Sequence, residues 1–189
     1  MISIAIPYYS GSGHTRKLAE FVLEGILNIP SIKAELFDIS NLSSNSWKKL
    51  HEANAIIFGC PTYMGNVSGA FKLFMDETSD FWVEQMWADK IAAGFTVGSS
   101  PSGDKLNSLV QMSIFAAQHG MIWVGQNQIG SFYTKDDLRI NEAGSYLGLM
   151  ALSDRDKSKL ISDYDARTAT LFGERIANAT KKWQHSSNQ

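Results

Sequence analysis

The stretch Ala55-Ile56-Ile57-Phe58-Gly59-Cys60 is apolar at every position. A strand without polar alternation is buried on both faces, which is typical of a parallel sheet covered by helices on its two sides. Residues 1–9 also predict a strand, because Ile2, Ile4 and Ile6 alternate with smaller residues. These two segments indicate a protein built around a buried sheet.

Strands and helices alternate outward from this run. Further strands are expected over residues 32–38, 90–97 and 121–124, and helices over 14–28, 47–51, 68–78, 104–119 and 155–182. Five strands that alternate with helices predict an α/β doubly wound fold with a parallel sheet. Pro7 lies inside the first strand, where it removes a ladder donor, so we expect it near a bulge or at the end of regular pairing.

Length and charge limit the classes of protein. The chain has 189 residues, and its 17 Lys and Arg against 19 Asp and Glu give a net charge of −2, which offers no electrostatic footprint for nucleic acid or an anionic membrane. One cysteine, Cys60, excludes an intramolecular disulfide, and four scattered histidines predict no metal site. With no signal peptide or apolar run long enough to cross a bilayer, we expect a cytoplasmic single domain over residues 1–183, followed by a polar tail, 184–189.

Three loops follow predicted strands and are rich in small or hydroxyl residues: 10–15, 61–67 and 98–103. In open α/β sheets, ligands bind beyond the carboxyl ends of the strands, near the point where the strand order reverses. We therefore expect these loops to form one binding site.

The first loop, Ser10-Gly11-Ser12-Gly13-His14-Thr15, has the features of a phosphate site. Its glycines allow close backbone approach, and the N–H groups and dipole at a helix N-terminus favour an anion. The nucleoside-triphosphate loop needs a Gly-Lys pair, which the sequence lacks, and the dinucleotide motif needs a third glycine where Arg16 stands. A merely structural turn with a serine cap is the alternative.

The pattern S-x-S-G-x-T of residues 10–15 resembles the phosphate loop of flavodoxin-like, FMN-binding proteins. The segment Pro61-Thr62-Tyr63-Met64-Gly65-Asn66 is similar to the P-T-x-x-G-N segment of the WrbA-type NAD(P)H:quinone oxidoreductases and related FMN reductases. The similarity continues through residues 74–78, 98–100 and 118–125, and is weakest at 38–52 and 126–145.

This resemblance implies a flavodoxin-like three-layer sandwich with a five-stranded parallel sheet in the order 2-1-3-4-5, and FMN as cofactor. Carried over by position, the implied cofactor-binding residues are Ser10, Ser12, Gly13, His14 and Thr15 for the phosphate, Pro61, Thr62, Tyr63, Met64, Gly65 and Asn66 for the ring, Ser99, Ser100 and Gly103 for its pyrimidine side, and His119 near the ring. The flavin carries the chemistry, so no side chain is expected as a catalytic acid or base. The family often has Arg-Phe where Tyr63-Met64 stands, which changes the charge near the flavin.

Several residues keep two interpretations. His119 ends a predicted helix and is expected either to contact the flavin or to interact with the helix dipole. The aromatic segment around Trp82 and Trp87 predicts either a covered sheet edge or the interface of a homodimer or homotetramer, in which Trp82 reaches a neighbouring substrate pocket. Cys60 is expected to be a small buried residue.

The resemblance implies an NAD(P)H-dependent oxidoreductase that reduces quinones or similar small-molecule acceptors by two-electron transfer. One-electron flavodoxins commonly hold the ring between aromatic side chains of two loops, whereas here only Tyr63 is available, and their strong acidity is missing. The alternatives are a flavodoxin-type one-electron carrier, a non-catalytic flavin-binding regulatory module and a reductase of free FMN. The sequence leaves open NADH or NADPH, the acceptor, and dimer or tetramer.

Overall fold

The computed structural model describes residues 1–130, 133, 139–154, 156 and 158–186. Its main sheet has the order β2-β1-β3-β5-β6, and these neighbours pair in parallel. The strands are β1 (Ile2–Tyr8), β2 (Ile32–Asp38), β3 (Ala55–Tyr63), β5 (Ile91–Gly98) and β6 (Ile122–Trp123). The short β4 (Asn66–Val67) only forms an antiparallel hairpin with β3, so the predicted order 2-1-3-4-5 is confirmed.

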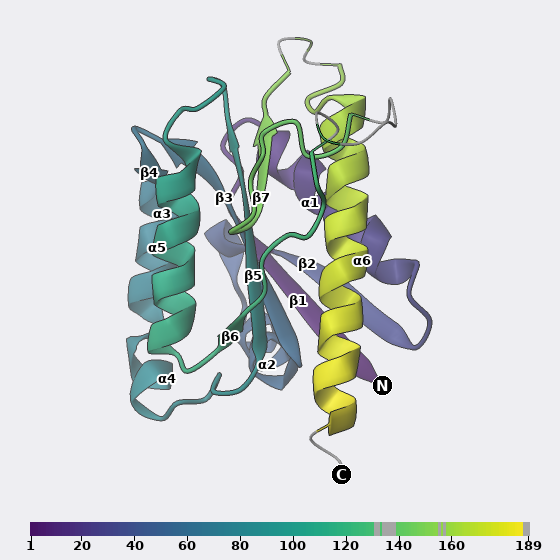
Figure 1. Cartoon of the computed structure of the whole chain (residues 1–189). Coiled ribbons are helices and arrows are strands. Elements are labelled where there is room, and N and C mark those ends of the chain that lie inside the picture. The colour runs from purple at the N-terminus through teal and green to yellow at the C-terminus, as the bar shows by residue number, and fades with distance from the viewer. Residues whose placement is uncertain (131–132, 134–138, 155, 157, 187–189) are drawn as a thin grey trace.

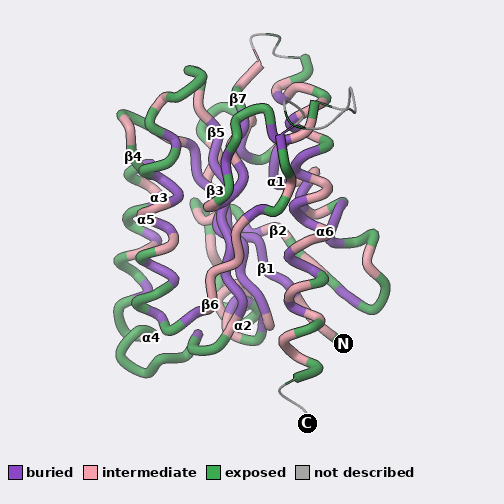
Figure 2. The backbone as a smooth tube through the Cα atoms, in the orientation of Figure 1, coloured by how far each residue is buried: buried purple, intermediate pink, exposed green. Residues whose placement is uncertain are grey.

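Helices cover both faces of the sheet, which gives three layers (Figure 1). One apolar core lies under α1 (His14–Leu27) and α6 (Asp163–Ser186). The other lies under α2 (Ser44–Glu52), α3 (Gly69–Glu77) and α5 (Lys105–Gln118), with the short α4 (Ser79–Val83) after α3. The central strands are buried along most of their length, as the run 55–60 predicts (Figure 2).

Helices α1 and α6 touch through a glycine from each. A β-carbon on Gly25 would lie 1.9 Å from the Thr170 carbonyl oxygen, and one on Gly173 would lie 2.1 Å from the Val22 carbonyl oxygen. Any larger residue at either position would push the helices apart, because real β-carbons do not approach backbone this closely. The contact fixes α1, and therefore the loop at its N-terminus, against the sheet.

The fifth strand is divided, and the prediction of a single strand over 121–124 was incomplete. β6 pairs with the first part of β5, at Ile91 and Ala92, whereas β7 (Leu149–Leu152) pairs in parallel with the last part, Phe95–Gly98. The intervening chain therefore leaves the sheet and returns in line with β6. β7 brings the backbone of Ser153 next to the end of β5, where Ser153 N donates to Gly98 O at 3.1 Å.

The last helix begins at Asp163 rather than at the expected residue 155. Ser153 and Ile161 form an antiparallel bridge, and the described residues between them are not helical. The Ser162 hydroxyl accepts a hydrogen bond from Asp165 N at 3.2 Å, a typical N-terminal cap that the sequence contained. The helix continues to Ser186, three residues into the expected tail.

Pro7 causes no bulge, but it lies where pairing with β3 is interrupted, one residue before β1 ends, as the second expected alternative has it. The register of β1 with β3 is the same at Ala5 and at Tyr8, and Pro7 itself pairs with Phe37 of β2. Between Ile4 and Tyr8, pairing of β1 with β3 is interrupted at Ile6 and Pro7, where proline has no N–H to donate. The strand thus tolerates the missing bond and delivers Tyr8 and the following loop to the carboxyl edge of the sheet.

No described helix is both long enough and apolar enough to cross a membrane. No group of three or more His, Cys, Asp or Glu side chains in the described part of the chain is placed to hold a metal ion.

Candidate cofactor site

The loop after β1 presents backbone donors that the protein itself does not use. Gly13 is the N-cap of α1, has a left-handed φ of 91°, and makes no side-chain cap. In this described segment, the N–H groups of residues 12–15 have no hydrogen-bond acceptor, and the first helical bond is Lys17 N to Gly13 O at 2.9 Å. Unpaired donors at a helix N-terminus are an anion-binding arrangement.

Hydroxyl groups complete this loop. Thr15 is buried and Ser12 is exposed, so the two hydroxyls lie at different depths of the same loop. The Ser10 hydroxyl accepts a bond from Arg16 N at 3.2 Å and so holds the loop against α1. Ser10 therefore shapes the loop, whereas Ser12 and Thr15 are available to a ligand.

A pocket of about 210 Å³ opens beside this loop. Its described lining comes from four strand ends: Gly11, Ser12, His14, Thr15, Pro61, Thr62, Tyr63, Val97, Gly98, Ser99 and Ser153. None of these residues is Asp, Glu, Lys or Arg, so attraction for an anion comes from backbone dipoles and hydroxyls rather than from a side-chain charge. Burial raises the pKa of the Tyr63 phenol, which keeps it neutral at pH 7.

The second loop is a tight hairpin. Tyr63 pairs with Asn66, which leaves Met64 and Gly65 as the turn, with φ values of 50° and 75°. Positive φ at both central residues is the pattern of a type I′ turn. The Asn107 amide donates to the Gly65 carbonyl at 2.8 Å and ties the hairpin to α5.

Tyr63 and Thr62 reach the pocket from this hairpin by different contacts. A β-carbon on Gly11 would lie 2.5 Å from the Tyr63 hydroxyl, so the ring lies directly against the loop of residues 10–15. The Thr62 hydroxyl bonds with those of Thr96 in β5 and Ser108 in α5, at 2.7 and 2.8 Å, and these two bonds fix its position. Met64 is fully exposed at the tip of the turn.

The third loop follows β5 and is held from inside the protein. Gly98 and Ser99 line the pocket, while Gly103 has a left-handed φ of 54° and closes the turn into α5. The carbonyls of Ser100 and Pro101 point inward and accept bonds from Lys105 Nζ at 2.6 and 2.8 Å. This buried lysine was missed, because a lysine early in a predicted helix is normally solvated.

The structure thus gathers the three predicted loops at one edge of the sheet. Of the predicted cofactor residues, seven line the pocket: Ser12, His14, Thr15, Pro61, Thr62, Tyr63 and Ser99. Others lie in the same loops without lining it: Ser10, Gly13, Met64, Gly65, Asn66, Ser100 and Gly103. Gly11, Val97, Gly98 and Ser153 line it without being among those predicted cofactor residues, and Ser153 could have been found only by recognising β7.

His119 does not join these loops within its own chain, which corrects the expected position beside the ring. It is the C-cap of α5, whose first turn carries the third loop, so a 14-residue helix, about 21 Å, separates them. Its Nε2 lies 2.9 Å from the Thr78 hydroxyl, and its ring packs on Trp87 and Phe115. Burial lowers the pKa of His119 to about 4, so the ring is neutral at pH 7.

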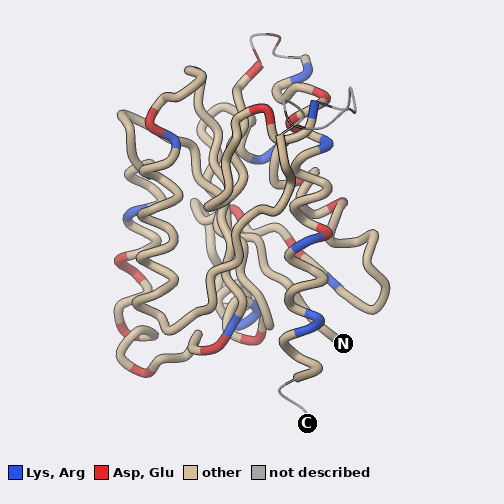
Figure 3. The backbone as a smooth tube through the Cα atoms, in the orientation of Figure 1, with Lys and Arg blue, Asp and Glu red and all other residues tan. Residues whose placement is uncertain are grey.

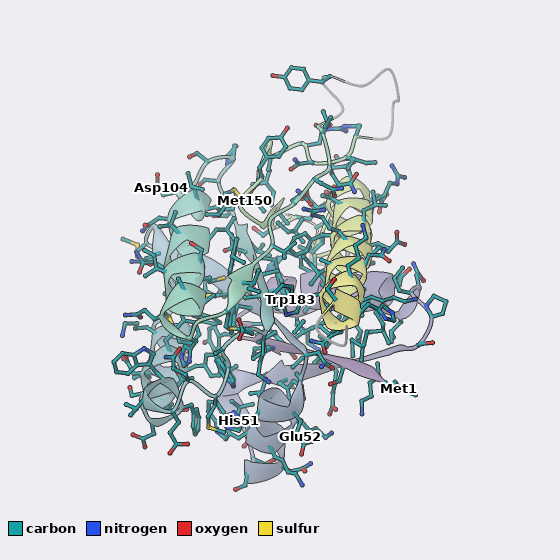
Figure 4. All side chains as sticks on the ribbon, turned by 60° about the horizontal axis from the view of Figure 1, so that its bottom comes forward. Met1, His51, Glu52, Asp104, Met150 and Trp183 are labelled. Atoms are coloured by element: carbon teal, nitrogen blue, oxygen red, sulfur yellow. The ribbon has the colours of Figure 1, made fainter. Side chains whose placement is uncertain are left out.

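The aromatic segment near α4 divides between core and surface. Trp87 is fully buried, and its Nε1 donates to His51 Nδ1 at 3.0 Å, while Phe81 packs edge-on to His51 at 4.4 Å. Trp82 and Met86 stay exposed. Figure 4 labels His51 at the end of the molecule opposite Asp104 and Met150, so Trp82 is not part of the pocket of its own chain.

The carboxyl-edge pocket fits the end of a mononucleotide. Four N–H groups and two hydroxyls that have no partner among the described residues, together with a helix N-terminus, match the three acceptor oxygens of a phosphate. Its volume is below the roughly 300 Å³ at which complete ligand sites begin, so a mononucleotide would fill it and extend into the open side. Fold and site together define a mononucleotide-binding protein of the flavodoxin type.

Comparisons with known proteins agree with this class and narrow it. The family described as NADPH-dependent FMN reductase matches residues 9–134, and the chain belongs to this family. The flavodoxin, WrbA-like protein from Agrobacterium tumefaciens superposes with a TM-score of 0.75 at 37% identity, covering 96% of this chain and 99% of that one. The flavodoxin-like fold and the resemblance to this family are therefore confirmed.

Two curated relatives cover almost the whole chain. Flavodoxin FldP of Pseudomonas aeruginosa (strain UCBPP-PA14) is 37% identical over 183 residues, 94% of this chain and 96% of the relative. An NAD(P)H dehydrogenase (quinone) of Geobacter sulfurreducens is 28% identical over 204 residues, 96% of this chain and 98% of the relative. The chain is an FMN-dependent oxidoreductase, with FMN as cofactor and NAD(P)H as electron donor.

Proposed function

We propose that the protein transfers two electrons from NAD(P)H to a quinone or a similar acceptor through FMN held at the carboxyl edge of the sheet. When bound in this pocket, FMN would supply the two-electron redox chemistry that links the nicotinamide to the acceptor. The balanced reaction is NAD(P)H + H⁺ + quinone → NAD(P)⁺ + hydroquinone. The protein side chains bind and orient the reactants.

The residues proposed to hold FMN are those of the three loops. The N–H groups of residues 12–15, with the hydroxyls of Ser12 and Thr15, would hold the phosphate. Tyr63, Ser99 and the backbone at Gly98 would border the ring. His119 is excluded from this set for the flavin of its own chain.

The two-electron proposal rests on the small number of aromatic side chains that line the pocket. Among the described lining residues, Tyr63 alone is aromatic, and the loop 98–103 has no aromatic side chain. A ring bordered by one aromatic residue leaves room for a nicotinamide or quinone to stack. Charges of both signs are interspersed over the molecule, so it lacks the acidic surface that steers a one-electron carrier (Figure 3).

A one-electron carrier is the second candidate, because one relative at 37% identity is named a flavodoxin. The FMN-reconstituted protein should oxidise NADH or NADPH in step with the reduction of a benzoquinone, one molecule of each per turnover. Absence of turnover with both nicotinamides, together with two separated one-electron steps in a reductive titration, would replace the proposal by the carrier. Absence of turnover without such steps would favour the non-catalytic flavin-binding module.

Homodimer or homotetramer assembly and a cytoplasmic location stay predictions. The exposed Trp82 and Met86 support an interface between copies, since large apolar side chains are costly in water. Sedimentation of wild-type protein and of Trp82→Ala checks this: the variant should dissociate more readily. A variant that stays assembled with unchanged quinone kinetics would contradict both the interface and a role in the pocket.

A further inference from the structure

The first residue of α5 is a lysine with almost no exposed surface. Lys105 is 1% exposed, and its Nζ donates to the carbonyls of Ser100 and Pro101 at 2.6 and 2.8 Å. Fully buried lysines are rare unless paired, because removing an ammonium from water is costly. Its placement here therefore needs a reason beyond the stability of the helix.

A buried carboxylate acts on the same group. Asp165, near the start of α6, accepts a bond from Leu152 N at 3.0 Å, at the end of β7. Burial lowers the pKa of Lys105 and raises that of Asp165, while each charge acts on the other in the opposite direction. Lys105 thus bonds the loop after β5, and Asp165 bonds the last residue of β7.

Lys105 lies immediately behind the pocket wall. Its Cγ would lie 3.2 Å from a β-carbon on Gly98, a residue that lines the pocket. Gly98 O in turn accepts the bond from Ser153 N, so the ends of β5 and β7 are joined beside the Lys105 side chain. The lining has no Lys or Arg side chain, and the Lys105 stem runs behind Gly98 to an ammonium that bonds the next loop carbonyls, those of Ser100 and Pro101.

We propose that Lys105 is a positioning residue for FMN: it fixes the backbone of residues 98–101 and provides a positive charge that favours the reduced, more negative flavin. The inference rests on the proposed placement of FMN in this pocket. The Lys105 ammonium acts within the roughly 10 Å over which salt leaves electrostatic interactions effective, and the Asp165 carboxylate offsets part of its effect. The charge should therefore stabilise the reduced cofactor more than the oxidised one.

Lys90 offers a matched control at the other end of the same strand. It is half-buried just before β5, and its Nζ donates to the carbonyls of His51 and Ala53 at 2.5 and 2.6 Å. Like Lys105, Lys90 donates to two backbone carbonyls. It lies just before β5, however, whereas the pocket lies at the other end of that strand. Loss of Lys90 should affect stability without affecting the flavin.

The test compares wild type, Lys105→Gln, Lys105→Arg and Lys90→Gln. Glutamine can still donate to a carbonyl but has no charge, and arginine keeps the charge. For each protein, the dissociation constant of FMN is measured by calorimetry and the midpoint potential by spectroelectrochemistry. Thermal unfolding with and without FMN reports whether each variant is folded.

Lys105→Gln should lose about tenfold more affinity for reduced than for oxidised FMN, which equals a two-electron midpoint about 30 mV more negative. Lys105→Arg should keep the wild-type potential, and Lys90→Gln should lower only the unfolding temperature. An unchanged potential in folded Lys105→Gln, or an equal shift in Lys90→Gln, overturns the inference. Failure of wild-type protein to bind FMN would instead overturn the proposed site.

Discussion

The two ends of the parallel sheet are built from different residues. At the carboxyl end, glycine and hydroxyl residues surround a 210 Å³ pocket, and the donors of residues 12–15 have no partner. At the amino end, His51, Trp87 and His119 each lie shortly before a strand and contact other rings, with Trp87 and His119 centroids 4.7 Å apart. The carboxyl end carries unpaired donors around a pocket, and the amino end carries packed aromatic rings.

This difference assigns stability and binding to separate regions. The packed rings bury apolar area, and the Trp87 indole N–H is satisfied by His51, so the amino end contributes to folding. Unpaired backbone donors contribute nothing to folding until an acceptor binds. Changes at the amino end should therefore alter unfolding, and changes at the carboxyl end should alter FMN affinity.

The largest effect is expected for Trp87→Ala. Removing a fully buried tryptophan should lower the free energy of unfolding by about 3–5 kcal/mol, measured by urea titration. FMN affinity of the folded variant should stay within about twofold of wild type. A large loss of affinity without a loss of stability would show that the two ends are not separate.

The next effect is expected for Ser12→Asp. A carboxylate near the phosphate would repel it by about 4 kcal/mol at 4 Å and an intermediate dielectric, so FMN affinity should fall at least about a hundredfold, even after solvent screening. Ser44→Asp, which adds the same charge at the exposed N-terminus of α2, is the control and should bind FMN normally. Equal affinities of the two variants would place the phosphate elsewhere.

Mild acid should lower the free energy of unfolding through His119 at the amino end of the sheet. The pKa of His119 falls to about 4 on burial, so between that value and the ordinary 6.5 the unfolded chain binds the extra proton. Stability is complete above about pH 6.5 and is lost as pH falls toward 4, at up to about 1.4 kcal/mol per pH unit. His51, whose pKa is lowered by burial and by Lys90, acts in the same direction.

Urea unfolding of wild type and His119→Gln between pH 4 and 7 checks this prediction. Glutamine can bond to Thr78 but does not titrate in this range, so the variant should show a flatter dependence. Identical slopes would mean that His119 is not the group responsible.

The smallest effect is expected for Gly13→Ala. Its φ of 91° costs an L-residue about 1–2 kcal/mol, although the nearest atom, of Leu160, is an acceptable 3.5 Å from the added carbon. FMN affinity should fall about tenfold, because the loop must distort. Gly69→Ala, at the start of α3 with no atom within 4 Å, is the control and should leave affinity unchanged.

The sequence predicted the features that depend on local pattern. The run 55–60, the alternation in residues 1–9 and the glycine-hydroxyl loop gave the sheet and the phosphate loop, because each is determined by neighbouring residues. β7 was missed because it is separated by a long segment from β6, whose place beside β5 it continues. Lys105 was missed and His119 was placed at the wrong end of the sheet, because their surroundings come from residues far away in the sequence, such as Asp165 and Trp87.

The most direct test of the central claim is a calorimetric comparison of FMN and riboflavin binding to the cofactor-free protein. If the N–H groups of residues 12–15 hold the phosphate, FMN should bind at least about a hundredfold more tightly than riboflavin, since several charge-assisted bonds are lost without it. Equal affinities for the two compounds, or no binding of either, would contradict the account.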